Sequence, residues 1–365
     1  MSVNSELKKA GIEVIEELDI MKINSIAKNI STSLCETFPD FGFNQNELFI
    51  KFCRLNMYRA KMPDGLAEAN YFYKNNSIYF NEHIDFDDLE EFAIHECIHY
   101  LQEIKDNKNV LLRMGLCDYT EFKIYGLALN EAAVQLISSK IVGIPKEYVK
   151  YFGISFETTS PSYYPLECCL VNQLGFLIGE DILFKSTLKS TNDFKNALIE
   201  ATSYKTFMNI QNSIDEILYA EEDIIKLNNK IIQYDDKNRK VDNMVNKIDC
   251  LKSEITLIFM RTQNLIISSF FNNLFDKISN MEEVENFRKK LHEFKSYLGF
   301  TEGYTFFNDY YVEMMSKLEH KANVIENGGM ETALNIKTKK DNIFITLIKA
   351  IKKLIFGKNS KEHDY

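Results

Sequence analysis

The feature that most constrains this chain is the pentapeptide His-Glu-Cys-Ile-His at residues 95–99. In an α-helix, residues four positions apart lie on the same face, one turn above the other. A helix therefore places His95 and His99 close enough for their imidazoles to share one zinc ion. Glu96 points toward the same edge, where its carboxylate can take a proton from a zinc-bound water molecule. The motif thus predicts a helix that carries two metal ligands and a general base.

The residues around the motif also favour a helix. Segment 85–88 offers aspartates, which begin helices well because their carboxylates accept hydrogen bonds from free backbone amides. Apolar residues then recur among polar ones at Leu89, Phe92, Ile98 and Leu101. The alternative interpretation is a helix with two solvated histidines.

A second strong helical pattern begins at Gly126 and continues to Ile137. Within it, Glu131 lies among Ala, Leu and Val residues, where a carboxylate is costly to bury unless it is paired or binds a metal. Glu131 is therefore the candidate third ligand, which completes a His₂Glu site with one open position. Gln135 lies one turn further along the same face and can orient a ligand histidine. The alternatives are an exposed helical glutamate and an ordinary surface glutamine.

Together, these two helices resemble those of a known family. The motif His-Glu-x-x-His on one helix, with Asn130-Glu131-Ala132 opening a later one, is similar to the gluzincin zinc metallopeptidases, the thermolysin-like group. The resemblance covers residues 70–136. It implies a zincin-like fold, a peptide or protein substrate and Glu96 as the base. It also implies one Zn²⁺ ion, with the ligands His95, His99 and Glu131.

The chain departs from this family in two respects. Gln135 stands where thermolysin-like enzymes often carry an aspartate, so a neutral amide replaces a carboxylate. We also identify no downstream histidine for the oxyanion-stabilising role that some members use. Hydroxyl groups are the substitutes: Tyr163 or Tyr164, in a rigid turn at residues 160–165, can donate to a developing oxyanion, and Tyr125 is a further option. The alternative for each of them is a purely structural role, because most of the 19 tyrosines in a chain of this kind serve packing.

Two aromatic-rich runs, residues 71–73 and 78–80, lie on either side of Asn75-Asn76. Asparagine tolerates the positive φ of tight turns, so this stretch predicts a β-hairpin immediately before the motif helix. An edge strand beside a zinc site can hold an extended peptide through backbone pairing. The alternative is a sheet that only covers the helix.

Glycine and proline are scarce, at 14 and 5 of 365 residues, which favours helices over a β-sandwich or a propeller. Because this length suits two or three domains, we expect an α+β, predominantly helical fold in three parts. Residues 1–205 would form a zincin-like catalytic domain with a small β-hairpin or sheet. Residues 206–326 would form a helical hairpin, coiled coil or bundle, and residues 327–365 a linker and a basic amphipathic tail.

Helical spacing of apolar residues supports this division. It predicts helices over residues 6–37. A similar spacing appears on both sides of a polar interruption at residues 234–240, which indicates a long antiparallel hairpin. Residues 284–298 and 306–322 would add helices to it.

Charge and cysteine usage narrow the class of protein. The formal net charge of -10 argues against nonspecific nucleic-acid binding. The N-terminal residues show no signal-peptide pattern, and no run of about eighteen apolar residues predicts a membrane-spanning helix. Seven cysteines without a CxxC spacing indicate reduced thiols, so we expect a cytoplasmic protein. Residues 341–356 combine apolar residues with a lysine face, which can contact an anionic membrane or dock on the helical bundle.

The expected function is that of a metallopeptidase, which hydrolyses peptide bonds with a zinc-activated water molecule and Glu96 as the base. The competing interpretation is a non-catalytic interaction protein that keeps a zincin-like fold and works through its helical half. The intact motif favours the enzyme, because a decayed site would be expected to lose Glu96 first.

Overall fold

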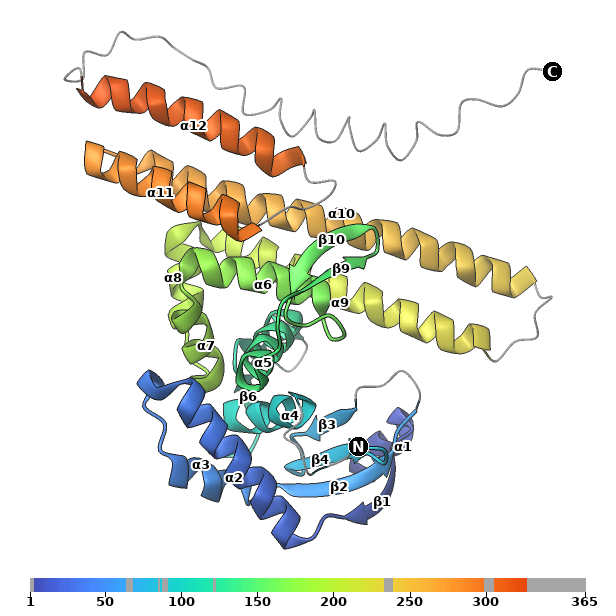
Figure 1. The fold of residues 1–365 in the computed structure, drawn as a ribbon. Coiled ribbons are helices and arrows are strands. Elements are labelled where there is room, and N and C mark those ends of the chain that lie inside the picture. Colours follow the sequence, from blue (N-terminus) through green and yellow to red (C-terminus); the bar gives the residue numbers. More distant parts are fainter. Residues whose placement is uncertain are drawn as a thin grey trace, which may run out of the picture. The chain divides into compact units, whose positions relative to one another are not determined.

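The computed structural model describes residues 3–63, 68–84, 86, 91–120, 123–232, 239–298 and 305–326. Helices dominate these residues and the strands form small sheets (Figure 1), which confirms a predominantly helical α+β fold. The chain divides into two units, Met1–Leu318 and Glu319–Tyr365. The boundary expected between residues 205 and 206 lies inside the first unit and stays a prediction.

The N-terminal sheet has the strand order β1-β2-β4-β3. Its strands are β1 (Glu13–Glu17), β2 (Asn56–Lys61), β3 (Ala69–Phe72) and β4 (Ser77–Asn81). β3 and β4 pair antiparallel, and the turn between them contains Asn76 at a φ of 50°. The hairpin expected from the two aromatic runs is therefore confirmed, and β3 is an edge strand of the sheet.

The helices around this sheet are α1 (Val3–Ala10), α2 (Ile20–Thr37), the short 3₁₀ helix η1 (Pro39–Phe41) and α3 (Gln45–Phe52). The expectation of helix throughout residues 6–37 is wrong at β1. There the chain pairs antiparallel with β2, with Glu13 opposite Lys61 and Glu17 opposite Tyr58. Backbone pairing with a neighbouring strand outweighs a helical spacing that is only local.

The motif lies on α4 (Glu91–Gln102), which packs against β3, α5 (Leu127–Val142) and α7 (Glu180–Lys189). α4 is buried from Ala93 to Tyr100, so the predicted helix is present and enclosed. His95 and His99 are 5% and 6% exposed, which rules out the alternative of two solvated histidines. The expected helix-starting residues Asp85, Asp87 and Asp88 and the apolar Leu89 lie outside the described residues.

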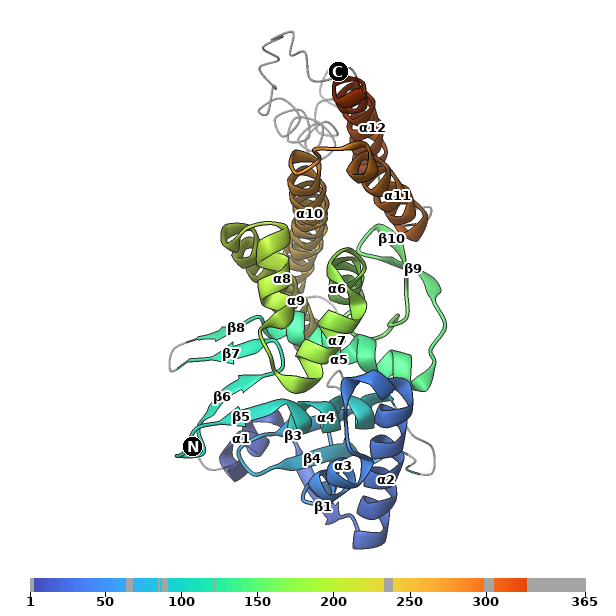
Figure 2. The same ribbon diagram turned by 90° about the vertical axis from the view of Figure 1, so that its left-hand side faces the viewer.

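A small antiparallel sheet connects α4 to α5 (Figure 2), with the strand order β5-β6-β7-β8. Its strands are β5 (Glu103–Lys105), β6 (Leu111–Met114), β7 (Cys117–Tyr119) and β8 (Ile124–Tyr125). After α5, a hairpin of β9 (Glu147–Tyr151) and β10 (Ile154–Thr158) leads into α6 (Pro165–Ile178), α7 and α8 (Asp193–Ala201).

Two long helices follow, α9 (Tyr204–Ile232) and α10 (Arg239–Asp276), and they lie side by side as the expected hairpin (Figure 1). The isoleucines that recur in α9 are buried at Ile210, Ile214, Ile217 and Ile224. α11 (Met281–Leu298) and α12 (Thr305–Glu326) complete the described helices. None of the helices in the described ranges is long and apolar enough to cross a membrane. The expected tail at residues 327–365, including the stretch 341–356, lies outside them.

Candidate metal centre

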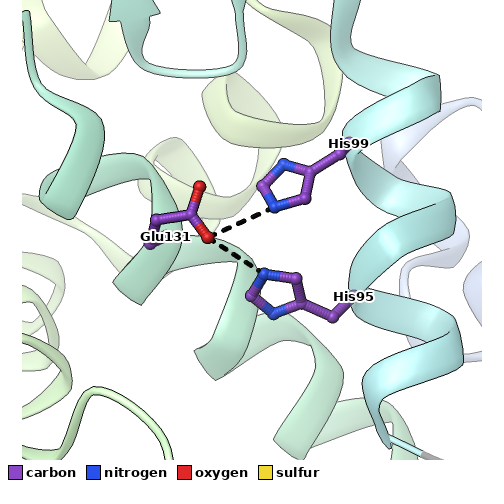
Figure 3. A group of neighbouring side chains, drawn as sticks. All are labelled: His95, His99 and Glu131. Atoms are coloured by element: carbon purple, nitrogen blue, oxygen red, sulfur yellow. Dashed lines mark hydrogen bonds and ion pairs between the residues drawn. The ribbon is translucent and has the colours of Figure 1, made fainter. Parts of the chain in front are cut away.

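Three side chains from two helices converge on one point (Figure 3). His95 and His99 come from α4, and Glu131 comes from α5. Glu131 Oε2 lies 3.2 Å from His95 Nε2 and 3.3 Å from His99 Nε2, and the three donor atoms lie within 4.8 Å of one another. Two ligands bound at about 2.0–2.1 Å in a tetrahedron are about 3.3 Å apart, so the separations of Glu131 from the two histidines fit a single ion. The three side chains can therefore hold a metal ion.

The charges within this buried group favour a bound cation. Burial by itself lowers the pKa of His99, but the Glu131 carboxylate outweighs it and raises the pKa to about 9. Burial by itself raises the pKa of Glu131, but His99 and His95 hold it well below its ordinary value. Without a metal, the His99 ring therefore keeps a proton that is hydrogen-bonded to the Glu131 carboxylate, and a metal ion bound to these atoms would replace that proton.

Glu96 lies next to this group and is 9% exposed. Its Oε2 accepts a hydrogen bond of 2.7 Å from the backbone N–H of Tyr71, on the edge strand β3. Burial raises the pKa of Glu96, and the nearby His95 and His99 oppose this rise. The sheet thus holds the candidate base in a fixed position beside the three ligands.

Each histidine has an amide oxygen at its second ring nitrogen. Gln135 Oε1 lies 3.0 Å from His95 Nδ1, and Gln102 Oε1 lies 3.3 Å from His99 Nδ1. Gln135 is 3% exposed, so it is not a surface glutamine, and its predicted position against a ligand histidine is the one found. Gln102 was not predicted from the sequence. Its position three residues after His99 on the same helix face could have indicated it.

The three candidate tyrosines take different positions. The ring of Tyr164 stacks beside that of His95, with centroids 6.3 Å apart. The Tyr163 carbonyl accepts hydrogen bonds from Ser160 and Cys168, and the Tyr125 ring lies 4.8 Å from the Lys123 ammonium. Among the three, ring contact with a ligand histidine is thus found for Tyr164.

The backbone of Tyr164 is unusual. It precedes the first turn of α6 with a φ of 50°, a conformation that is strained for a residue with a large side chain. Burial raises the pKa of its phenol well above the ordinary value, and the charges of Glu131 and Glu96 add to this effect. The Tyr164 phenol is therefore neutral and able to donate a hydrogen bond, and its ring lies beside a candidate ligand.

The start of the Glu131 helix is fixed by a residue far along the chain. α5 follows Gly126, which has a φ of 75° and no side chain to cap the helix. Asp215 of α9 takes this role, accepting hydrogen bonds from Gly126 N at 3.0 Å and Ala128 N at 2.9 Å. A carboxylate there satisfies free amides and interacts favourably with the helix dipole. The helical half of the chain therefore helps to position the third ligand.

Two further buried acids, away from the three candidate ligands, lie one on α6 and one on α9. Glu167 is 0% exposed and Glu221 is 9% exposed, and the two carboxyl groups lie close enough to share a proton in a hydrogen bond. Burial raises the pKa of both carboxyl groups, and the charge of Glu167 raises that of Glu221 further. Two carboxylates this close and this buried favour a form that keeps a proton.

This pair predicts that stability falls as the pH rises. A carboxyl group whose folded-state pKa is raised stabilises the fold fully below its unfolded-state value, and this contribution is lost as the pH rises through the folded-state value. Glu221→Gln removes the second acid, so its free energy of unfolding should exceed the wild-type value by about 1–3 kcal/mol near pH 8, and by much less near pH 5. Urea unfolding at the two pH values measures this difference. Glu222→Gln, at a residue exposed beside Lys226, is the control and should change little at either pH. A free energy of unfolding of the wild type that is equal at both pH values would contradict the raised pKa values of Glu167 and Glu221.

Comparisons of the chain with protein-family models, with curated proteins and with solved structures found no match. The likeness to gluzincins therefore depends on the motif residues alone.

Proposed function

We propose that this protein is a zinc-dependent peptidase. The observation that supports it best is the convergence of His95, His99 and Glu131, whose donor atoms lie within 4.8 Å of one another, beside the buried Glu96. Two imidazoles and one carboxylate are a donor set of catalytic zinc sites, which keep one position open for water or substrate. A zinc ion there would lower the pKa of a water molecule and polarise the carbonyl of a peptide.

Glu96 would act as the general base. It follows the ligand His95 directly, so its carboxylate is available at the edge of the site, and the Tyr71 N–H holds one of its oxygens. It would take a proton from the attacking water molecule and later pass that proton to the leaving amine. A base of this kind needs a fixed position more than it needs flexibility, and the hydrogen bond to β3 provides it.

Tyr164 would donate a hydrogen bond to the oxyanion that forms as the carbonyl is attacked. Its ring lies against that of His95, and its strained backbone conformation is of the kind found at functional sites. Tyr164 is the strongest of the three candidates because its ring contact with His95 is the one that is described.

The edge strand β3 would hold the substrate in an extended conformation. It lies at the end of its sheet and packs against α4, and its Tyr71 N–H already reaches Glu96. A peptide that pairs with the free edge of β3 would therefore pass close to the candidate base. The substrate class that follows is an unfolded or extended segment of a peptide or protein.

We also propose a cytoplasmic setting. All seven cysteines lie in the described part of the chain, and none of them forms a disulfide. This is the thiol state of a reducing compartment.

Incubation of the purified protein with a peptide library, with and without a chelator, tests the proposed activity. We expect cleavage in the untreated sample, no cleavage with the chelator, and recovery when zinc is added back. Cleavage that persists in the chelator would contradict metal dependence. No cleavage in any sample would favour the competing interpretation, a non-catalytic interaction protein that works through its helical half.

A further inference from the structure

The two ligand helices are joined by a reciprocal pair of amides. Gln102, the last residue of α4, donates from Nε2 to Asn130 Oδ1 at 3.3 Å, and Asn130 donates from Nδ2 to Gln102 Oε1 at 3.3 Å. Both side chains are 1% exposed. Asn130 directly precedes the ligand Glu131 on α5. Each ligand helix therefore contributes one amide to a buried contact immediately behind the metal centre.

Further hydrogen bonds fix which way each amide faces. Gln102 Nε2 donates to the backbone carbonyl of Thr187 at 2.9 Å, and the backbone N–H of Leu116 donates to Asn130 Oδ1 at 3.0 Å. A carbonyl can only accept and a backbone N–H can only donate, so neither amide can turn over without losing a bond. The oxygen of Gln102 consequently faces His99.

This orientation determines how His99 can bind a metal. Gln102 Oε1 lies 3.3 Å from His99 Nδ1 and can only accept a hydrogen bond, so Nδ1 carries a proton. The other nitrogen, Nε2, lies 3.3 Å from Glu131 and is the atom that can bind the ion (Figure 3). The Gln102 amide therefore fixes both the direction of the ring and the nitrogen that is offered to the metal.

The space around the amide pair is closed by the turn between β6 and β7. Gly115 lies there with a φ of 58°, and a Cβ atom on it would come within 2.0 Å of Asn130 Oδ1 and 2.5 Å of Gln102 Nε2. Only glycine leaves room for the two amides. The amide of Gln135, which contacts His95, is not fixed in this way, because its Nε2 has no hydrogen-bond partner within the described residues.

We propose that Gln102 is a positioning residue of the metal centre. Paired with Asn130, it sets the spacing of the two ligand helices and presents Nε2 of His99 to the ion. This role rests on the proposed metal site and adds to it a residue outside the His-Glu-x-x-His motif. Loss of such a support typically weakens metal binding by about 10- to 100-fold.

Gln102→Met tests this role, because methionine is similar in size and its sulfur is only a weak acceptor for the hydrogen bond from His99 Nδ1. Zinc affinity, measured by competition with a chromophoric chelator, should fall by about 10- to 100-fold relative to the wild type. Gln263→Met is the matched control. Gln263 is also a buried glutamine, 3% exposed, but it lies on α10, which carries none of the three ligands, and its Oε1 has no partner among the described residues. Its replacement should leave zinc affinity unchanged.

The outcomes separate this role from the metal site itself. Wild-type protein that binds zinc, together with a folded Gln102→Met variant of equal affinity, would overturn the positioning role and leave the site intact. Wild-type protein that binds no zinc would overturn both. A second measurement uses wild-type protein alone: ¹⁵N NMR of the zinc-loaded form should show Nδ1 of His99 protonated and Nε2 bound to zinc. Zinc bound through Nδ1 would contradict the proposal even if the variant fails to fold.

Discussion

Glu96→Gln is expected to keep its metal ion and to hydrolyse peptides about 10²- to 10⁴-fold more slowly than the wild type. An amide has nearly the shape of a carboxylate, but it cannot take a proton from water. Its oxygen can still accept the Tyr71 N–H, which bonds Glu96 at 2.7 Å, so the site should keep its form. The loss should therefore appear in kcat, with metal content unchanged.

Steady-state hydrolysis and the zinc content of the same samples give both quantities. The matched control is Glu91→Gln on the same helix. Glu91 bonds to Ser139 outside the ligand group, and glutamine can keep that bond, so hydrolysis should be retained. A zinc-loaded Glu96→Gln variant with wild-type kcat would remove Glu96 from the role of base.

Glu131→Ala is expected to lose bound zinc altogether, and with it all hydrolysis. The Glu131 carboxylate lies between the two imidazoles, 3.2 Å from one ring and 3.3 Å from the other. Without it the site has two neutral ligands and no negatively charged ligand, and the remaining pair falls short of the three protein ligands of catalytic zinc sites. Zinc content after gel filtration should fall from about one ion per chain to near zero.

Glu180→Ala is the control for this variant. The Glu180 side chain is 48% exposed and forms an ion pair with Lys140. Lys140 lies on the same helix as Glu131, but more than two turns further along that helix, so the change should leave the ligands untouched. It should keep its zinc. A Glu131→Ala variant that retains one ion per chain would show that other residues bind the metal.

Much of the metal centre follows from spacing in the sequence. Two histidines four residues apart lie on one face of a helix and can share an ion there, and α4 has that form. Glu131 was recognisable because a carboxylate among Ala, Leu and Val needs a partner, and it has two in His95 and His99. The β3–β4 hairpin followed from its aromatic runs and from an asparagine that tolerates positive φ.

The residues that support the centre could not be predicted in the same way. Gln102 meets Asn130 across 28 positions, and Asp215 meets Gly126 across 89. Periodicity shows which face of a helix is buried but not which helix covers it. The isoleucine spacing of α9 indicated a buried helix, but not that Asp215 would cap the Glu131 helix. Similarly, Tyr163 and Tyr164 share one turn, and only the backbone geometry brings the Tyr164 ring to His95.

Anomalous diffraction at the zinc edge, from crystals of the wild-type protein grown with zinc, is the most direct test of whether two imidazoles and a carboxylate bind one ion. We predict one strong peak per chain, bonded to Nε2 of His95, Nε2 of His99 and a carboxylate oxygen of Glu131. Zinc-loaded crystals with no peak at these three atoms, or with the zinc held by other residues, would contradict it.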